Sequence, residues 1–413
     1  MNNTSPKYCQ VVIAGGSTAG ISMAAALKAA RPELHISLIE PSQQHYYQPA
    51  WTLVGGGAMT QQQSVRDQAP LIPKGVEWIR DRVAAFDPDN NQLTLETGGL
   101  LEYKYLVVAL GLQLNWAAIE GLEQTLGANG VTSNYSFDLA PYTWQCVKNL
   151  KGGRALFTQP PMPIKCAGAP QKILYLAADH WRRNNVSAES HFFTQGAAMF
   201  GVPFYAKALN KIVASYGATP HFGMNLTAVD GANQVATFTD AEGNTRTEKF
   251  NFLHVTPPQS APDVIKQSAL AGAGGWVEVD RNSLQHKRFD NVFALGDCTD
   301  TPNAKTAAAI RRQFPVVVTN LLASIDQNSA AANGSYDGYG GCPLTTEKGK
   351  VLMAEFRYDG EVVSSFNCDP RVPRRFYWWM KEKFFPLLYW NVILKGRDWN
   401  KPEAKPRPGV TEE

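Results

Sequence analysis

Residues 9–20 read CQVVIAGGSTAG, an apolar segment that runs directly into a glycine-rich turn. The segment Cys9–Ile13 predicts a buried strand, and the residues after the turn predict a helix through Ala30. A second apolar segment, His35–Glu40, ends on an acid twenty positions after Gly20. Strand, turn, helix and strand in this order are typical of a dinucleotide-binding unit, in which amides at the helix N-terminus hold a pyrophosphate.

The turn and the acid after the second strand are expected to contact this nucleotide. The residues are Gly15, Gly16, Ser17, Ala19, Gly20 and Glu40. The usual GxGxxG pattern has Ser17 at its middle glycine, so we expect a side chain where backbone normally approaches phosphate. The carboxylate of Glu40 is suited to accept hydrogen bonds from ribose hydroxyls.

Two later segments also predict a buried strand that ends in a small-residue turn. Tyr105–Gly111 (YLVVALG) and Asn291–Asp297 (NVFALGD) resemble the flavin-domain signatures of the two-dinucleotide-domain disulfide reductase superfamily. The resemblance implies bound FAD, with Ala109, Gly111 and Gly296 near the cofactor and Asp297 at its ribityl chain. Three ordinary strands that each end in a glycine turn are the alternative.

A second unit of the same kind is predicted further along the chain, but its phosphate-binding turn is missing. Arg154–Thr158 predicts its first strand, and residues 159–166 then read QPPMPIKC. Prolines have no N–H group and cannot line a phosphate cradle. We therefore expect a second Rossmann-like domain without a nicotinamide site, and an electron donor other than NADH or NADPH.

Length and composition limit the fold and the class of protein. The chain has 413 residues, 44% hydrophobic content and a formal charge of +3, which favours two or three domains and argues against nucleic-acid binding. Six cysteines without a CxxC pair indicate neither a disulfide scaffold nor a metal site. The predicted class is α/β, with two Rossmann-like dinucleotide-binding domains and a C-terminal amphipathic membrane-interface module. The expected boundaries are 1–112 and 286–328 for the FAD domain, 113–285 for the second domain and 329–413 for the C-terminal region.

Cys166 is placed where a thiol can be reactive. It precedes Pro170 and a predicted helix over 171–183, and it follows Lys165. A helix N-terminus and an adjacent cation both lower the pKa of a thiol. The alternative is a cysteine that packs as a small apolar side chain.

Five motifs extend the resemblance to one family: HYYQPAWTLVG (45–55), KCAGAPQK (165–172), HVTPP (254–258), KTAAA (305–309) and GCPL (341–344). They resemble the sulfide:quinone oxidoreductases, above all the type that includes the mitochondrial enzymes. The resemblance implies that Cys166 faces the flavin and that Cys342 is its partner in a disulfide or sulfur-bridged pair. Sulfide would attack Cys342, leave a persulfide there and free the Cys166 thiolate, which can add to the flavin. Lys305 and the alanine-rich helix after it would stabilise the reduced flavin.

The family also implies the partners. They are hydrogen sulfide, ubiquinone or another membrane quinone, and a sulfane-sulfur acceptor that is sulfite, a thiol or polysulfide. An NADH:quinone oxidoreductase of the same superfamily and a membrane-bound flavin redox sensor without turnover remain alternatives. Cys9, Cys146, Cys298 and Cys368 are expected to be structural, and so are His45 and His254.

The C-terminal region predicts contact with a membrane surface. Residues 371–407 contain ten Lys or Arg against three acids, and Phe376–Leu394 is rich in aromatics. We expect two short helices in a bilayer interface, with basic side chains on lipid phosphates, although a core or dimer face is the alternative. No window has 18 uninterrupted apolar residues, so the protein is expected to be peripheral, on a bacterial inner membrane or an organellar equivalent. Arg311, Arg312, Phe314 and Pro315 depart from the family pattern in the helix beyond the flavin, and 401–413 predicts an extended tail.

Overall fold

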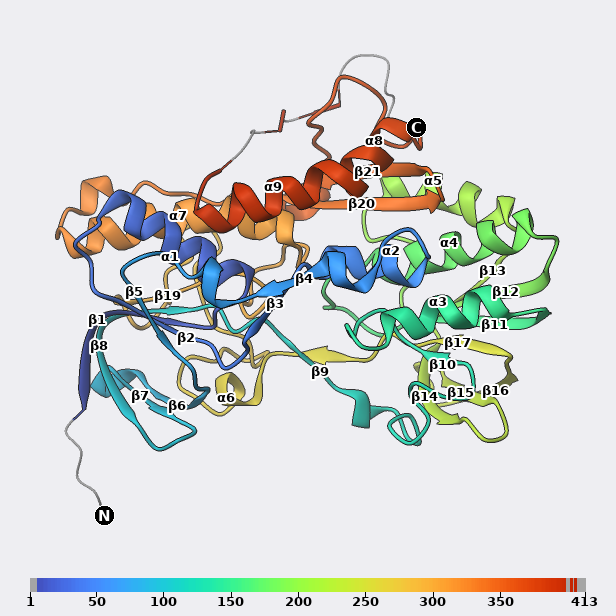
Figure 1. Ribbon diagram of the computed structural model, residues 1–413, viewed down its shortest axis with the longest axis horizontal. Coiled ribbons are helices and arrows are strands. Elements are labelled where there is room, and N and C mark those ends of the chain that lie inside the picture. Colours follow the sequence, from blue (N-terminus) through green and yellow to red (C-terminus); the bar gives the residue numbers. More distant parts are fainter. Residues whose placement is uncertain (1–5, 399–401, 404, 407–413) are drawn as a thin grey trace.

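The computed structural model describes residues 6–398, 402–403 and 405–406. Two lobes lie side by side along the long axis, and the C-terminal helices run along one edge across both (Figure 1). Of the expected tail over 401–413, only 402–403 and 405–406 are described, and Glu403 pairs with Ser364 through two backbone hydrogen bonds.

The first lobe is built on a seven-stranded sheet in the order β5-β2-β1-β8-β7-β6, with β19 also paired to β8. Its strands are β1 (Lys7–Ala14), β2 (Ile36–Ile39), β5 (Val76–Ile79), β6 (Val83–Asp87), β7 (Gln92–Leu95), β8 (Leu100–Val108) and β19 (Val292–Ala294). β1 pairs in parallel with β2 and β8, and β8 pairs in parallel with β19. The three predicted cofactor segments therefore end at the same edge of one sheet.

The second lobe contains a five-stranded parallel sheet in the order β10-β17-β11-β12-β13. Its strands are β10 (Val131–Thr132), β11 (Gly152–Gln159), β12 (Ser187–Thr194), β13 (Thr219–Phe222) and β17 (Phe252–His254). An antiparallel sheet of β14 (Asn225–Asp230), β15 (Val235–Thr239) and β16 (Thr245–Lys249) lies beside it. The predicted α/β class with two Rossmann-like parallel sheets is confirmed.

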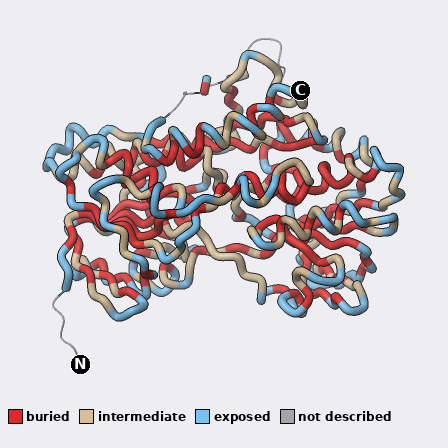
Figure 2. The backbone as a smooth tube through the Cα atoms, viewed as in Figure 1, coloured by how far each residue is buried: buried red, intermediate tan, exposed pale blue. Residues whose placement is uncertain are grey.

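Helices cover these sheets, which explains why each central strand contains a buried apolar run. They are α1 (Thr18–Ala30), α3 (Ala140–Asn149), α4 (Ala169–Arg183), α5 (Pro203–Ser215) and α7 (Ala307–Ile325). Val11–Ala14 of β1 and Ala155–Phe157 of β11 are fully buried, as expected for parallel strands with covered faces (Figure 2).

Shorter elements connect the two lobes and the surface loops. They are the pairs β3 (Gln44–Tyr46) with β4 (Val65–Asp67) and β9 (Gln113–Leu114) with β18 (Gln259–Ser260), the helices α2 (Trp51–Gly55) and α6 (Asp263–Lys266), and the 3-10 turns η1 (Gln48–Ala50), η2 (Gln61–Ser64), η3 (Ala69–Leu71), η4 (Pro88–Asn90), η5 (Trp116–Ala118), η6 (Ser329–Ala331) and η7 (Tyr358–Gly360).

Helix α7 forms despite the departures that the sequence shows there. Pro315 lies inside the helix, and Phe314 and Arg311 are buried. The hydroxyl of Thr319 donates to the Pro315 carbonyl over 3.0 Å. Packing against α1 and the first sheet holds the helix in place, so the proline does not end it.

The C-terminal region consists of a hairpin and a helical run. The hairpin is β20 (Gly340–Glu347) with β21 (Lys350–Phe356), and β20 packs on α4. The run comprises α8 (Arg375–Trp379), the π-helical turn η8 (Met380–Phe384), α9 (Phe385–Asn391) and η9 (Ile393–Lys395).

The two faces of this helical run have different surroundings. Tyr389, Trp390 and Leu394 are buried in the core of the first lobe, whereas Tyr377 packs under the hairpin. Phe376, Trp379 and Leu387 are exposed by 54%, 51% and 60% on the outer face. The segment is thus partly core, as the alternative interpretation held, and partly an exposed apolar surface. In the described part of the chain, no helix is long and apolar enough to cross a bilayer.

Candidate active site between the two sheets

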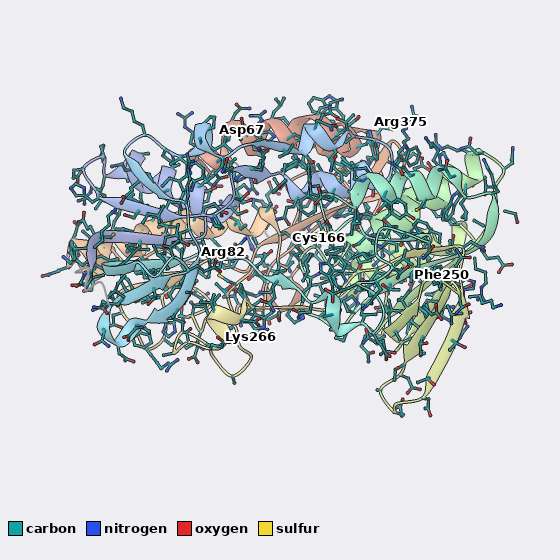
Figure 3. All side chains as sticks on the ribbon, turned by 60° about the horizontal axis from the view of Figure 1, so that its bottom comes forward. Asp67, Arg82, Cys166, Phe250, Lys266 and Arg375 are labelled. Atoms are coloured by element: carbon teal, nitrogen blue, oxygen red, sulfur yellow. The ribbon has the colours of Figure 1, made fainter. Side chains whose placement is uncertain are left out.

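A cavity lies between the two lobes, at the centre of the molecule, where Cys166 projects from the second lobe (Figure 3). Its wall combines the start of α1, the turns after β8 and β19, the start of α7, the loop around Cys166 and the inner face of the C-terminal helices. Seven of the predicted cofactor residues line this wall, namely Ser17, Ala19, Ala109, Gly111, Gly296, Asp297 and Lys305, whereas Gly15, Gly16, Gly20 and Glu40 do not.

The glycine-rich turn after β1 requires two of its glycines. Gly15 has φ +104°, and a Cβ atom there would lie 2.5 Å from the Ala109 carbonyl oxygen. A Cβ atom on Gly20 would lie 1.8 Å from the Gly15 carbonyl oxygen. Ser17 is different, because it has φ −80°, which does not require glycine, and it is exposed at the cavity. The serine is therefore compatible with the turn.

Glu40 supports the turn from behind. Its carboxylate accepts hydrogen bonds from the amides of Gly16, over 2.9 Å, and Ser42, over 2.8 Å. The side chain lies at the end of β2, as predicted, and its remaining acceptor capacity is what a ribose would use.

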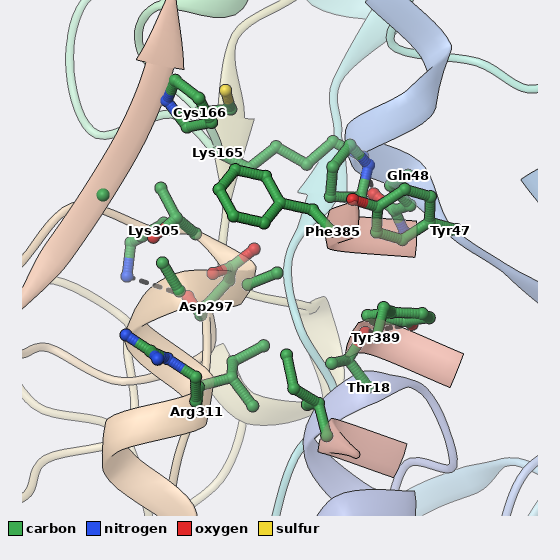
Figure 4. A pocket seen from close by; sticks show the side chains of 18 of the residues that line it. Thr18, Tyr47, Gln48, Lys165, Cys166, Asp297, Lys305, Arg311, Phe385 and Tyr389 are labelled. Atoms are coloured by element: carbon green, nitrogen blue, oxygen red, sulfur yellow. Dashed lines mark hydrogen bonds between the residues drawn. The ribbon is translucent and has the colours of Figure 1, made fainter. Parts of the chain in front are cut away.

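Asp297 and Lys305 lie on the opposite side of the cavity (Figure 4). Burial raises the pKa of Asp297 above its ordinary value. The Lys305 ammonium is buried and donates to the carbonyls of Asp297 and Thr299 over 2.8 and 2.9 Å, and it lies 4.2 Å from the centroid of the Trp276 ring. The alternative of a solvated surface lysine is wrong, and Lys305 fixes the loop that presents Asp297.

The loop after β11 carries Cys166 into the cavity. Its amide donates to the Lys305 carbonyl over 2.9 Å, and its carbonyl accepts from the Ala169 amide and the Tyr135 hydroxyl. Cys166 adopts φ +49°, an uncommon value for a residue with a side chain, and these contacts hold it there. Residues 159–166, which replace the glycine-rich turn of a nucleotide site, therefore position a thiol.

Cys342 approaches the same point from β20. The two Sγ atoms are 4.0 Å apart, and both cysteines are free thiols in this structure. A Cβ atom on Gly168 would lie 2.6 Å from the Cys342 sulfur, so only glycine permits this approach. The structure brings together the two cysteines that the family motifs singled out.

The lysine that acts on Cys166 is Lys172 rather than the predicted Lys165. The Lys172 ammonium, in the first turn of α4, donates to the Cys166 sulfur over 3.0 Å. The hydrogen bond from Cys342 and the charge of Lys172 hold the pKa of the Cys166 thiol well below its ordinary value, against the effect of burial. The same hydrogen bond and burial raise the pKa of Cys342. Cys166 is thus the thiolate of the pair.

Two further lysines differ from their predicted surroundings. Lys165 donates to the Gln48 side chain over 2.7 Å, and burial lowers the pKa of its ammonium to about 8. Lys381, expected among the headgroup-binding cations, is buried and donates to the Pro343 carbonyl over 3.1 Å. Burial, with the repulsion of Lys172, lowers the pKa of Lys381 to about 7. The neighbours of Lys381 in the sequence are aromatic and charged, so no local pattern predicted that its side chain points inward.

Sequence reasoning did not detect a hydrogen-bonded chain behind the glycine turn. Gln68 donates to the Gly16 carbonyl over 2.6 Å, His45 contacts the Gln68 oxygen over 3.0 Å, and the Tyr389 hydroxyl lies 2.7 Å from both His45 and Thr18. Burial lowers the pKa of His45 to about 4, so the ring is neutral. This series of hydrogen bonds links α9, which carries Tyr389, to the glycine-rich turn after β1.

The other cysteines and His254 lie outside the cavity wall. Cys298 is buried and contacts two backbone carbonyls, and Cys368 lies 2.8 Å from the Tyr377 hydroxyl. Burial lowers the pKa of His254 to about 3, and its ring nitrogen lies 2.8 Å from the Asn134 side chain.

Comparison with known proteins identifies the family. A mitochondrial sulfide:quinone oxidoreductase of Dictyostelium discoideum is 42% identical over 397 residues, which cover 95% of this chain and 87% of the relative. The mouse mitochondrial enzyme is 40% identical over 403 residues, which cover 97% and 89%. The chain belongs to the sulfide:quinone oxidoreductase family.

Two further comparisons agree with this family. Residues 9–142 match the family model described as pyridine nucleotide-disulphide oxidoreductase. The crystal structure of the sulfide:quinone oxidoreductase from Aquifex aeolicus has the same fold, with a TM-score of 0.77, 20% identity and coverage of 98% of this chain and all of that one. The family that the five motifs predicted is therefore confirmed. The chain is an oxidoreductase and belongs to this superfamily of flavoproteins. A bacterial membrane gains no support, because both relatives of about 40% identity are mitochondrial.

Proposed function

We propose that this sulfide:quinone oxidoreductase oxidises hydrogen sulfide at Cys166 and Cys342 and passes the electrons through FAD to ubiquinone or another membrane quinone. The thiol pair carries the proposal: the sulfurs are 4.0 Å apart at the cavity, and the Lys172 ammonium lies 3.0 Å from one of them. A surface or packing role does not require a buried lysine that stabilises one member of a thiol pair.

The residues around the cavity fit FAD. The first turn of α1 has neither an acidic residue nor a side-chain cap, so its amides suit a pyrophosphate. Asp297 would accept hydrogen bonds from the ribityl hydroxyls. The N-terminus of α7 would favour negative charge on the flavin ring. When bound, the flavin accepts an electron pair and passes it to quinone. The proposed contacts are Gly15, Gly16, Ser17, Ala19, Gly20, Glu40, Ala109, Gly111, Gly296, Asp297 and, through the Asp297 loop, Lys305.

The sulfur step begins with the pair oxidised to a disulfide. HS⁻ attacks the Cys342 sulfur, the bond to Cys166 breaks, and its electron pair leaves on Cys166 as a thiolate. Cys342 keeps the new sulfur as a persulfide. Lys172 makes Cys166 the better leaving group because it stabilises the thiolate.

Turnover requires that the cysteine pair is restored. A nucleophilic acceptor, namely sulfite, a thiol or polysulfide, removes the outer sulfur and leaves Cys342 as a thiol. The dithiol then gives up two electrons and two protons, for which bound FAD would be the electron acceptor, and the two sulfurs join again as a disulfide. The quinone takes up this electron pair with two protons.

Quinone is proposed to reach the cavity from the C-terminal side. Phe385, Leu388 and Ile393 form an apolar wall there, and the exposed Phe376, Trp379 and Leu387 lie on the outer face of the same helical run. These features support attachment to a bilayer interface, and the mitochondrial relatives favour an organellar inner membrane.

The structure changes how this attachment should be tested. Deleting residues 372–413 would also remove Tyr389 and Leu394 from the core of the first lobe and Lys381 from beside the thiol pair. We therefore expect the deletion to damage the fold and the site together. Phe376→Ser with Leu387→Ser, on the exposed face alone, is expected to weaken binding to vesicles and reduction of long-chain quinones while sulfide still reduces the flavin.

An anaerobic titration with sulfide tests the proposed reaction. With sulfite present as the sulfur acceptor, sulfide should bleach the flavin, NADH should not, and a short-chain quinone should restore the colour repeatedly. Bleaching by NADH would favour the NADH:quinone oxidoreductase, and bleaching without turnover would favour the redox sensor.

A further inference from the structure

A second groove lies away from the active-site cavity, between the β3–β4 hairpin and the end of α9. Arg66 and Asp67 of the hairpin form one side, and Trp390, Asn391 and Lys395 form the other. None of these side chains lines the cavity that contains the thiol pair.

Two cations in this groove form no ion pair with an acidic side chain of the described residues. Arg66 and Lys395 are both exposed, and neither forms an ion pair with any described residue. By contrast, Arg312 and Arg371, elsewhere on the surface, pair with Asp398 and Asp369. Asp67 contributes one negative charge to the groove, and its carboxylate accepts from the Gln44 side chain over 2.9 Å. The groove thus has an excess of positive charge that the protein leaves uncompensated.

Trp390 keeps one of these cations in position. The guanidinium carbon of Arg66 lies 4.3 Å from the centroid of the Trp390 ring, and Trp390 is itself buried. Stacking on a fixed ring orients the guanidinium plane and leaves its N–H donors for an anion.

The groove continues the exposed apolar face of the C-terminal helices. Phe376 and Trp379 stack on that face with ring centroids 6.0 Å apart, and Leu387 lies further along the run. Leu387 and Asn391 are four residues apart in α9 and share one side of it. The exposed face therefore runs from aromatic and aliphatic side chains to a cationic end.

We propose that the groove between Arg66 and Lys395 binds the phosphate of an anionic phospholipid, whose acyl chains lie along the exposed face of Phe376, Trp379 and Leu387. This inference rests on the proposed attachment to a membrane. A lipid matches both halves of the surface, because its phosphate suits the cations and its chains suit the apolar side chains. A free phosphate would use only the groove.

The test uses the full-length, flavin-loaded protein and two kinds of vesicle. One kind contains phosphatidylcholine alone, and the other contains added phosphatidylglycerol. The variant is Arg66→Gln with Lys395→Gln. The matched control is Arg80→Gln with Lys74→Gln, because Arg80 is also exposed and lies 4.3 Å from the Trp78 ring.

The groove variant should lose about 10-fold in affinity for the anionic vesicles and keep its affinity for the neutral ones. The control should change both affinities less than about twofold. Sulfide-dependent reduction of a short-chain quinone in solution should be unchanged, which verifies folding.

Three results would overturn the inference. The groove variant could retain the full preference for anionic vesicles, or inorganic phosphate could remove that preference more than chloride at equal ionic strength, which would indicate a free-phosphate site. A lower molecular mass of the groove variant than of the wild-type protein in solution would show that a second copy of the chain occupies the groove. Failure of the wild-type protein to bind either vesicle would instead contradict the proposed membrane attachment itself.

Discussion

The loops after β1 and β11 occupy equivalent places in the two parallel sheets, and each leads into a helix. The first is a tight turn in which Gly15 and Gly20 allow backbone to pack on backbone. The second, residues 159–168, is longer, and the contacts of Cys166 with Lys305 and Tyr135 hold it. One architecture thus supplies a phosphate cradle in one lobe and a thiol site in the other, and the local residues decide which.

Removing the thiol of the second loop should have the largest effect. Cys166→Ser, and separately Cys342→Ser, should lower sulfide-dependent quinone reduction by on the order of 10³-fold or more, because each removes half of the exchange couple. Steady-state assays with a short-chain quinone measure this. Cys146→Ser and Cys298→Ser are the controls, and near-normal turnover of either cavity variant would refute the two-cysteine mechanism.

Breaking the first loop should affect the cofactor rather than the sulfur chemistry. Gly20→Ala places a Cβ atom 1.8 Å from the Gly15 carbonyl oxygen, so the turn must open. We expect loss of bound flavin and a lower free energy of unfolding, by roughly 2 kcal/mol or more. Flavin absorbance after gel filtration and chemical denaturation report the two effects. A variant that retained stoichiometric flavin would show that this turn does not hold the cofactor.

Lys172 sharpens the comparison, because it is what makes the second loop a thiolate site. The depressed pKa of Cys166 keeps its thiolate present as the pH falls well below the ordinary range of a thiol, and the thiolate is lost only below that lowered pKa. Lys172→Met should raise this pKa and move the acid limb of the activity profile to higher pH, with about a 10- to 100-fold loss near neutrality.

The rate of alkylation of reduced Cys166 against pH, read by peptide mass spectrometry, measures the thiolate directly. Lys165→Met is the matched control, since the Lys165 ammonium donates to Gln48 and not to the sulfur. Equal shifts in the two variants would contradict the assignment of Lys172.

Ser17→Gly should have the smallest effect. The residue has φ −80° and is exposed at the cavity, so restoring the usual glycine relieves no backbone strain. Flavin affinity should change by less than about twofold, because the amides of the turn, which both residues provide, are the main proposed contacts with the pyrophosphate. A large gain in flavin affinity, measured by titration of the apoprotein, would show that the serine side chain obstructs the pyrophosphate.

Local patterns predicted the strands and turns well, whereas contacts between distant segments escaped sequence reasoning. The expected strand at 9–13 and helix through Ala30 correspond to β1 and α1. Family motifs alone linked Cys166 to Cys342, 176 positions later. The inward direction of Lys381 and the contact of His45 with Tyr389 depend on how the C-terminal helices dock, which no local pattern encodes.

Lys172 and Gly168 could have been inferred, because both lie within the motif that contains Cys166. A lysine six positions after the cysteine, in the first turn of a helix that starts beside the thiol, can reach back to the sulfur. Lys165 was predicted only because it is adjacent to Cys166 in the sequence, and its ammonium points to Gln48 instead.

The position of the first sulfur atom tests the central claim most directly. The oxidised protein would be mixed anaerobically with one equivalent of sulfide and no acceptor, alkylated, and digested for peptide mass spectrometry. We predict one additional sulfur atom on the Cys342 peptide and a singly alkylated thiol on Cys166, because the thiolate stabilised by Lys172 is the leaving group. Additional sulfur on Cys166, or on neither cysteine, would contradict the proposed mechanism.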